Sequence, residues 1–452
     1  MSVVTDWIHA AADRRPDRVA IEGLERNLTY AELREAAVAG AGALHGAVRV
    51  AVALPPGEDF VVALHACLVA GAAAIPIDLR LSEAERAKRQ GGAEIVIDAP
   101  LDSPIDGSGA SSSGRAGQPA SPEGDGARSR APDGDGARSR APDGDAAVAL
   151  MYTSGTTADP KPVVLSHGNF LASALGSAVA LGLDPAERWL CPMPLTHVGG
   201  LSIPIRSAIY GTTAILHDRF DTVAVLGDLM DPARRITLVS LVPTMLARLL
   251  DAGLQRPPTL RWALLGGGPI APGLLERAKA AGVPVAPTYG MTEACSQIAT
   301  FGWPLPGVDL QVAADGEVLV RGPIVSAGAL AEDGWLHTGD LGRFDDRNRL
   351  EIVGRKSDTI VTGGENVAPA EVEAILLAHP AVADAAVHPR PDPEWGEAVI
   401  ATVVLRDGVA VTPEALKAYC TARLAAFKVP KAVKFADGLP RTPSGKLLRR
   451  QL

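Results

Sequence analysis

"ITLVSLVPTMLARLLDAG", residues 236–253, joins an apolar run to a helical pattern, and this pairing recurs along the chain. WALLGGG (262–268) and VPVAPTYG (283–290) are apolar runs that end in glycine turns, and GLLERAKAAG (273–282) between them has helical spacing. Short buried strands that alternate with helices form parallel sheets, because each helix returns the chain to the same edge. The stretch therefore predicts an α/β fold with mostly parallel sheets.

The length of the chain predicts more than one domain. The 452 residues exceed one ordinary core, and 47% of them are hydrophobic at a mean hydropathy of +0.14. Two or three well-buried domains are expected. After about residue 354 the pattern changes to helix, strand, strand and helix, beginning with EVEAILLAHP (371–380). This change predicts a small C-terminal α+β domain of about 95 residues, a size that folds independently.

One segment differs in composition from the rest of the chain. Between residues 103 and 145 the residues are mainly Gly, Ser, Ala, Pro, Asp and Arg, and GDGARSRAPD occurs in tandem at 124–133 and 134–143. Such a segment cannot bury enough apolar surface to offset its ordering entropy. It is interpreted as a disordered, low-complexity surface insertion.

Bulk charge and cysteine content exclude several classes of protein. A net charge of −9, without a basic cluster, argues against a nucleic-acid partner. The four cysteines form no C-x-x-C pair, which argues against a zinc site or a disulfide framework. The apolar run 61–77 is short for a membrane span and is interpreted as a buried helix, a glycine turn and a strand. With no signal-peptide core at the N-terminus, the sequence predicts a cytoplasmic protein without a membrane span.

A hydroxyl-rich loop suggests phosphate binding. MYTSGTTADPKPVVLSHGNF (151–170) places five hydroxyl or glycine residues (153–157) ahead of Lys161, between two apolar runs. Hydroxyls and backbone N–H groups donate to phosphate oxygens, and a lysine neutralises their charge. The stretch does not fit the G-x-x-x-x-G-K-[ST] loop, and a plain surface turn is the alternative.

Further candidates follow predicted strands or lie in glycine-rich turns. They are Gly266–Gly268 in LLGGGPI; Tyr289, Gly290, Thr292 and Glu293 in PTYGMTEACSQIA; Asp340 in a glycine-flanked turn of DGWLHTGDLGRF; Arg355, Gly363 and Gly364 in LEIVGRKSDTIVTGGEN; and Lys446 in PRTPSGKLLRRQL. Each alone has an ordinary explanation as a turn, a core residue or a solvated charge. Their order and spacing together are specific.

These motifs resemble the adenylate-forming superfamily of acyl-CoA synthetases, peptide-synthetase adenylation domains and luciferases. The resemblance runs from DRVAIE (17–22) to the final lysine, interrupted only by the insertion. It implies an N-terminal ATP- and acid-binding domain (1–354), a hinge (355–357) and a mobile C-terminal domain (358–452). It also implies that a carboxylic acid and ATP form an acyl-adenylate with the help of Mg²⁺, and that coenzyme A then attacks the adenylate.

The resemblance assigns a role to each candidate residue. Lys446 and Thr292 resemble contacts to the α-phosphate, and Glu293 resembles the Mg²⁺ ligand, since a hard cation takes oxygen ligands. The positions that resemble the family's pyrophosphate-binding loop are Thr153, Ser154, Gly155, Thr156, Thr157 and Lys161. Those that resemble its adenine slot are Gly266, Gly267, Gly268 and Tyr289, with Gly290 beside them. Asp340 and Arg355 resemble its ribose contacts, and Gly363 and Gly364 resemble the glycines that line its pantetheine path.

Three positions depart from the family pattern. Ala158 and Pro162 replace two glycines of the phosphate loop, where alanine resists positive φ and proline removes a backbone donor. Ser357 stands at a hinge position that is usually Asp or Lys. The two substitutions in the loop are also compatible with a protein that binds ATP but does not turn it over.

The acid-binding region resembles most the subfamily that ligates o-succinylbenzoate to CoA in menaquinone biosynthesis. The stretches that carry this resemblance are MPLTHVGGLSI (193–203), ITLVSLVPTMLARLL (236–250) and YGMTEACSQIAT (289–300). It implies that Arg248 holds the second carboxylate of the acid, since a guanidinium fork suits that group. Ser296 and Gln297 would add polar contacts, and His197 would lie at the pocket mouth in a catalytic or substrate-binding role.

Both roles have an ordinary alternative: Arg248 would be an arginine on a helix surface, and His197 would be a structural histidine. Three rival functions also stay open: a CoA ligase for another aromatic or medium-chain acid, an enzyme that loads a carrier protein, and an ATP-binding protein without turnover. The expected partners are small molecules, and the sequence also allows a homo-oligomer.

Overall fold

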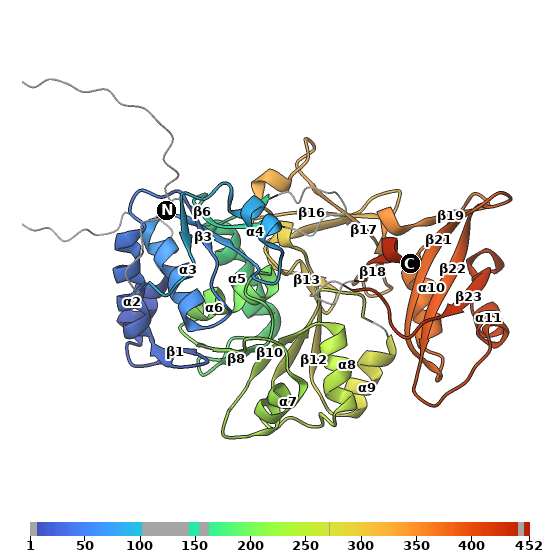
Figure 1. Ribbon diagram of the computed structural model, residues 1–452, viewed down its shortest axis with the longest axis horizontal. Helices are drawn as coiled ribbons and strands as arrows, with labels where there is room; N and C mark the ends of the chain where they lie inside the picture. Colours follow the sequence, from blue (N-terminus) through green and yellow to red (C-terminus); the bar gives the residue numbers. More distant parts are fainter. Residues whose placement is uncertain (1–6, 102–143, 153–161, 271, 442–446) are drawn as a thin grey trace, which may run out of the picture.

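The computed structural model describes residues 7–101, 144–152, 162–270, 272–441 and 447–452 (Figure 1). The predicted positions outside these ranges are Thr153, Ser154, Gly155, Thr156, Thr157, Ala158, Lys161, Lys446 and nearly all of the 103–145 insertion. Within the described ranges the chain forms four sheets, two of them mostly parallel. The α/β prediction is therefore confirmed.

The largest sheet contains the stretch quoted first. Its strands run in the order β14 (Trp303–Pro304), β13 (Ala299–Thr300), β12 (Val285–Tyr289), β11 (Trp262–Leu265), β10 (Leu238–Leu241), β8 (Arg188–Cys191), β9 (Thr213–Leu216), β1 (Val19–Glu22) and β2 (Asn27–Thr29). Strands β12 to β1 are parallel along this order, and antiparallel strands occur only at the two ends of the described sheet. Pro243 begins helix α8 (Pro243–Asp251) at a first-turn position, where its missing N–H costs nothing. That proline marks the change from strand to helix.

The second mostly parallel sheet is smaller. Its order is β5 (Ile95–Ile97), β3 (Arg49–Val52), β4 (Ala73–Pro76), β6 (Ala147–Tyr152) and β7 (Pro162–Ser166), with β7 antiparallel at the edge. The predicted helix, turn and strand at 61–77 are confirmed as α3 (Glu58–Ala70), Gly71 at φ 74° and β4. Pro162 is the first residue of the edge strand, where a missing backbone donor is tolerated.

Helices cover the faces of these two sheets. The larger core joins side chains of both sheets with α1 (Trp7–Arg14), α2 (Tyr30–Ala43), α3, α5 (His167–Leu181) and α6 (Val198–Tyr210). A second core lies under α7 (Thr222–Met230), α8 and α9 (Pro272–Ala280). Helix α4 (Glu83–Gln90) has no buried residue. None of the helices in the described ranges has both the length and the apolar character that a bilayer crossing requires.

A four-stranded antiparallel sheet, absent from the predictions, follows the large sheet in sequence. Its strands are β15 (Asp309–Val312), β16 (Glu317–Arg321), β17 (Leu336–Phe344) and β18 (Leu350–Arg355), in that order. The prediction that Asp340 lies in a turn is wrong, because Asp340 is inside β17 and is paired with Arg355 in β18. The glycines that suggested a turn have another role: Gly339 has φ 69°, and the β17–β18 register shifts between Leu341 and Gly342.

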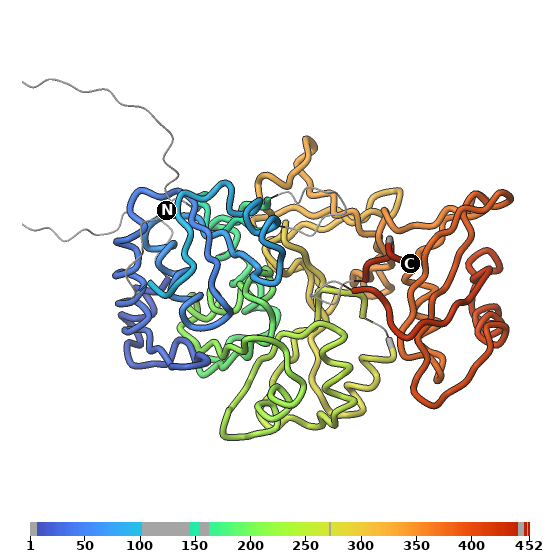
Figure 2. The backbone as a smooth tube through the Cα atoms, in the orientation of Figure 1, coloured from blue at the N-terminus to red at the C-terminus, as the bar shows by residue number. Residues whose placement is uncertain are grey.

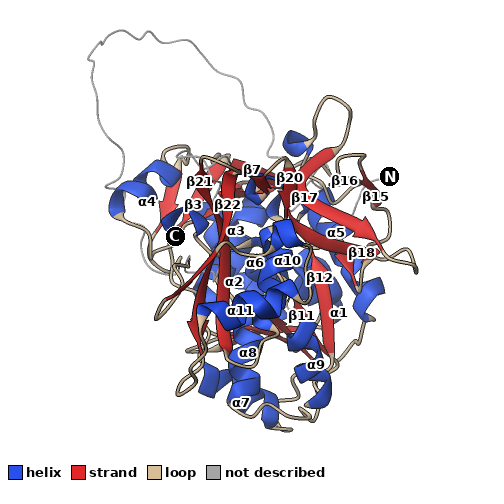
Figure 3. Ribbon diagram, turned by 90° about the vertical axis from the view of Figure 1, so that its right-hand side faces the viewer, coloured by secondary structure: helices blue, strands red, loops and turns tan. Residues whose placement is uncertain are grey.

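The small domain has a sheet and a core of its own. Its elements are β19 (Ile360–Thr362), β20 (Glu365–Val367), α10 (Pro369–Leu377), β21 (Val382–Asp392), β22 (Gly396–Leu405), α11 (Pro413–Thr421) and β23 (Ala432–Phe435). Figure 3 looks onto this domain and shows α10 and α11 next to each other. The helix, strand, strand, helix prediction is confirmed.

Strand β18 ends at Arg355, next to the predicted boundary between the two domains. A short 3₁₀ helix, η3 (Lys356–Asp358), links it to β19, and Figure 2 follows the chain through this connection. The predicted hinge, residues 355–357, lies here and stays a prediction. The remaining 3₁₀ helices are η1 (Thr292–Ala294), η2 (Ala327–Ala329), η4 (Ala426–Lys428) and η5 (Arg449–Gln451).

Candidate active site

Three candidate residues from separate strands meet in one cluster. The Tyr289 hydroxyl at the end of β12 donates to Asp340 Oδ2 (2.8 Å). Arg355 Nε lies 2.7 Å from Asp340 Oδ1, and Asp340 is only 6% exposed. Burial raises the pKa of Tyr289, and the negative charge of Asp340 raises it further. The hydroxyl of Tyr289 therefore keeps its proton and donates it to the hydrogen bond with Asp340. The cluster joins the large sheet to the antiparallel sheet.

The glycine run after β11 lies against the next strand. A Cβ on Gly266 would come within 2.7 Å of Thr288 Cγ2 and 2.9 Å of its carbonyl oxygen. Gly267 has φ 77°, a conformation that side-chain-bearing residues rarely adopt. Bare backbone is therefore required directly beside Thr288, one residue before Tyr289. Such a flat strip of backbone fits the predicted adenine slot.

The loop that carries Thr292 and Glu293 has a strained backbone. Cys295 has φ 49° and Ser296 has φ 90°, although neither is glycine. A Cβ on Gly290 would lie 1.6 Å from the Ser296 carbonyl oxygen, so this position accepts only glycine. The Ser173 hydroxyl from α5 donates to the Cys295 carbonyl (2.7 Å) and so holds the turn in place.

Glu293 is half-buried in this loop. The described residues contain no group of three or more His, Cys, Asp or Glu side chains that could hold a metal by itself. A single carboxylate is nevertheless enough for Mg²⁺ where substrate phosphates supply further ligands. The predicted role of Glu293 is compatible with this geometry.

A fully buried arginine was not predicted. Arg206 in α6 is 2% exposed, its Nη2 donates to Ser173 Oγ (2.9 Å), and no described residue accepts a bond from its Nε. Burial lowers the pKa of Arg206, and no described carboxylate forms an ion pair with it. A buried charge without a counter-ion is costly. Through Ser173 this guanidinium connects to the Cys295 turn, and its Cζ lies 5.8 Å from the centroid of the Trp189 ring.

The predicted acid-binding residues lie in different environments. Arg248 is exposed on α8 and has no ion-pair partner within the described ranges. Gln297 is 1% exposed and donates to Thr300 Oγ1 (3.0 Å), while its own Oε1 lacks a partner among described atoms. Ser296 is half-buried next to it. Ser296 and Gln297 therefore belong to the turn to which Arg206 connects through Ser173, whereas Arg248 lies on α8 and its predicted role stays a prediction.

His197 occupies the N-cap position of α6 without making a capping bond. Its side chain is half-buried, and burial lowers its pKa, although the charge of Asp78 opposes this effect. Because its pKa is lowered, His197 is mainly neutral near pH 7. The backbone here is tight, since a Cβ on Gly200 would lie 2.3 Å from the Pro194 oxygen.

The two ends of the segment that contains Lys446 are fixed to the small domain. On one side Arg441 Nη2 lies 2.7 Å from Asp384 Oδ2 in β21. On the other side Arg449 pairs with Glu373 in α10. The N–H of Leu448 also donates to the Pro440 carbonyl (2.9 Å), so the described residues before and after residues 442–446 are bonded to each other. Any motion of the small domain therefore carries these flanking residues with it.

Gly363 and Gly364 form the turn between β19 and β20. Their φ values of 59° and 84° are those of a two-residue hairpin turn, which glycine favours. A Cβ on Gly363 would lie 2.7 Å from the ring of Trp395. The glycine therefore lets the turn lie directly against an aromatic side chain.

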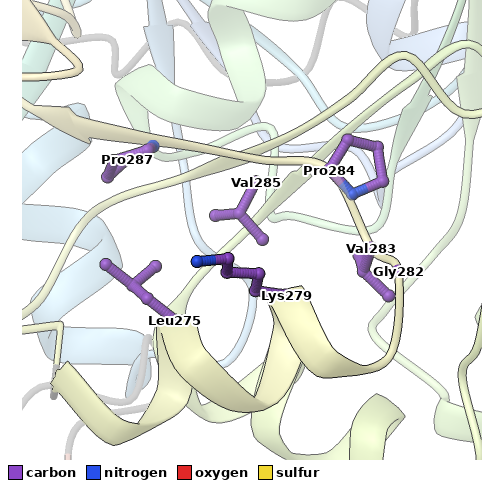
Figure 4. A pocket seen from close by; sticks show the side chains of 7 residues that line it. All are labelled: Leu275, Lys279, Gly282, Val283, Pro284, Val285 and Pro287. Carbon is purple, nitrogen blue, oxygen red and sulfur yellow. The ribbon is translucent and has the colours of Figure 1, made fainter.

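A hollow of about 430 Å³ lies apart from these residues. Figure 4 shows it between Leu275 and Lys279 of α9 and the segment that leads into β12. None of the candidate site residues lines it. The hollow is therefore not part of the candidate site.

Comparison with known proteins agrees with this geometry. Residues 8–330 match the family of AMP-binding enzymes, and residues 371–446 match the AMP-binding enzyme C-terminal domain. The chain belongs to the family of AMP-binding enzymes.

Within that family the similarity is more specific. A 2-succinylbenzoate–CoA ligase of Bacillus licheniformis is 38% identical over 485 residues, which cover 99% of each chain. The o-succinylbenzoate CoA synthetase of Bacillus subtilis in complex with the acyl-adenylate OSB-AMP is 34% identical, with a TM-score of 0.84 over 99% of this chain and 97% of that one. Its complex with ATP and magnesium ion, also 34% identical, has a TM-score of 0.84 over 99% of both chains.

A further structure of the Bacillus subtilis enzyme is less similar. Its double mutant bound to the product analogue OSB-NCoA is 34% identical, with a TM-score of 0.66 over 99% of this chain and 98% of that one. The structure described here therefore resembles the adenylate and ATP complexes more than the product-analogue complex.

Proposed function

We propose that this chain is an ATP-dependent ligase that converts 2-succinylbenzoate to 2-succinylbenzoyl-CoA in menaquinone biosynthesis. The observation that carries the proposal is its full-length similarity to a relative solved with the corresponding acyl-adenylate. ATP and CoA are cytoplasmic metabolites, so we also propose a cytoplasmic location.

In the first half-reaction a carboxylate oxygen of the acid attacks the α-phosphorus of ATP, and the bond to pyrophosphate breaks. The Tyr289–Asp340–Arg355 cluster supports a nucleoside site, since the buried carboxylate that Tyr289 and Arg355 hold in place would accept hydrogen bonds from ribose hydroxyls. Thr292 would donate to the α-phosphate, and Mg²⁺ held by Glu293 would offset the phosphate charge. Lys446 would stabilise the charge that builds on the same phosphorus.

In the second half-reaction the CoA thiolate attacks the acyl carbon, and AMP leaves with the bonding electron pair. A hinge at residues 355–357 would move the small domain between the two steps. The Gly363–Gly364 turn, without side chains, would then leave room for the pantetheine arm.

The second carboxylate of the acid requires a cationic partner. Arg206 supports this role because it is buried without a described counter-ion beside the Cys295–Gln297 turn. Arg248, the arginine implied by sequence, is the alternative and would have to act from an exposed position on α8. A guanidinium binds a carboxylate through two parallel hydrogen bonds, so either would discriminate dicarboxylic from monocarboxylic acids.

The proposal is tested with a panel of acids. Pyrophosphate release and thioester formation are measured for 2-succinylbenzoate, benzoate, medium-chain fatty acids and malonate at equal concentrations. A clear preference for 2-succinylbenzoate in both assays supports the proposal. Equal use of the other acids, or thioester formation only on a carrier protein, would assign the chain to one of the rival functions.

A further inference from the structure

One carboxylate outside the predicted site touches both the Asp340 strand and the hinge. Glu317 begins β16 and is 7% exposed. Its Oε1 accepts the Gly339 N–H (2.9 Å), and its Oε2 accepts from Lys356 Nζ (3.1 Å). His337 Nδ1 lies 3.5 Å from the same Oε2. Partial burial alone would raise the pKa of Glu317. The hydrogen bonds, led by those from Lys356 and Gly339, outweigh this effect and lower the pKa.

Both partners of Glu317 occupy important positions. Gly339 precedes Asp340 in β17 and has φ 69°, so its bond to Glu317 holds the backbone directly before the ribose candidate. Lys356 follows Arg355 and begins the connection to the small domain. The same Lys356 nitrogen lies 2.6 Å from Asp315 Oδ2, an exposed carboxylate in the turn before β16.

The two ion pairs of Lys356 differ in their surroundings. The Asp315 side chain is 53% exposed, and such a pair contributes little because water and salt screen it. The Glu317 side chain is 9% exposed, so the loss of Lys356 would leave a largely buried carboxylate with fewer partners. The Glu317 contact is therefore the stronger restraint on the first residue after β18.

We propose that Glu317 is a positioning residue that fixes Lys356 of the hinge to the Asp340 strand and so favours the domain arrangement that forms the adenylate. The inference rests on the proposed two-step function. A rotation about residues 355–357 changes the backbone at Lys356, so a contact made in one arrangement biases the equilibrium toward it. Loss of the contact lowers the population of that arrangement.

The test uses conservative variants and separates the two half-reactions. Glu317→Gln keeps an oxygen acceptor for Gly339 but removes the charge that holds Lys356, and Lys356→Met removes the other partner. Each variant is expected to lower acid-dependent ATP–pyrophosphate exchange about three- to tenfold, the range for one partly buried ion pair. Thioester formation from supplied acyl-adenylate should stay at or above the parent rate.

The matched control is another ion pair on the same sheet. Arg343 in β17 pairs with Glu351 in β18 (2.9 Å), and both side chains are exposed. Arg343→Met should leave both half-reactions unchanged. The double variant Glu317→Gln/Lys356→Met should be no worse than the poorer single variant, because both substitutions break one contact. Equal losses in both half-reactions, unchanged rates, or additive losses would overturn the proposal.

A substrate-free measurement separates this inference from the proposed function. Hydrogen–deuterium exchange of the full-length apo protein is followed at residues 356–359, where the variant loses the Lys356 ion pair. Faster exchange there in Glu317→Gln, with Arg343→Met unchanged, supports the contact even if 2-succinylbenzoate is not the substrate. Exchange equal to the parent at residues 356–359 would refute it, whichever acid the enzyme uses.

Discussion

The hydroxyl of Tyr289 donates a 2.8 Å hydrogen bond to Asp340, and Arg355 holds the other carboxylate oxygen at 2.7 Å. This relationship joins the end of a parallel strand to the strand pair that leads into the small domain. The candidate residues for nucleoside binding therefore lie next to the segment that links β18 to the small domain.

Asp340→Asn should weaken ATP binding. The substitution keeps the shape but removes the charge that faces Arg355, and a hydrogen bond to a charged group contributes about 1.5–3 kcal/mol, or roughly 10–100-fold in affinity. The KM for ATP should rise within that range, measured by pyrophosphate release, with a smaller change in kcat. Asp345→Asn, which alters another carboxylate–arginine pair of the same strand connection, is the control and should leave KM unchanged. An unchanged KM in Asp340→Asn would exclude a ribose contact.

Arg206→Met and Arg248→Met distinguish the two candidates for the second carboxylate. Loss of the true partner should raise the KM for 2-succinylbenzoate by about 10–100-fold, since a charged hydrogen-bond partner is removed. A benzoyl analogue without the second carboxylate should react equally well with parent and variant. If Arg206 only supports the Cys295 turn, its variant should unfold earlier and lose activity equally with both acids. No effect from either variant would require another carboxylate partner.

Lys446→Ala should reduce adenylation about 10²–10³-fold, the scale of losing one transition-state donor. Thioester formation from supplied acyl-adenylate should continue, because that step does not use the lysine. Lys434→Ala, which changes an exposed lysine of the same domain, serves as the control. Equal losses in the two steps would contradict a lysine that serves only one domain arrangement.

Acidification should destabilise the fold through His197. Burial holds its folded-state pKa below the ordinary value of 6.5, despite Asp78, while Arg80 and Arg89 lower it further. The unfolded state therefore takes up a proton first as the pH falls through about 6.5, so the free energy of unfolding declines in that window. Chemical denaturation between about pH 7.5 and 5 measures the slope, and His197→Asn should flatten it. His388, whose pKa burial also lowers, contributes a slope that this variant keeps; an identical slope in parent and variant would contradict the assignment.

Much of the fold was predictable because local signals agree with it. The proline at position 243 and the glycines after β11 mark the ends of strands that the apolar runs already define. The antiparallel sheet was missed because its glycines suggested turns, whereas Gly339 and the irregular pairing at Gly342 lie within a strand pair. A glycine in sequence does not distinguish a bulge from a turn.

The site residues that lie in sequence motifs were predictable, and those that are recognised only by their burial were not. The sequence brought Tyr289, Asp340 and Arg355 into one site through the family resemblance, and the structure places them in contact. Arg206 was missed because an arginine in an apolar helix does not reveal that it lacks a counter-ion. Glu317 was missed because its partners, Gly339 and Lys356, are distant in sequence and meet only through the strand pairing.

The central claim is tested most directly by product analysis of the purified protein with ATP, Mg²⁺, CoA and 2-succinylbenzoate. AMP, pyrophosphate and the thioester are quantified together by chromatography and mass spectrometry. The account predicts 2-succinylbenzoyl-CoA in equal amount to AMP and pyrophosphate, with none formed when ATP is omitted. ATP binding without pyrophosphate release, or AMP formation without this thioester, would contradict it.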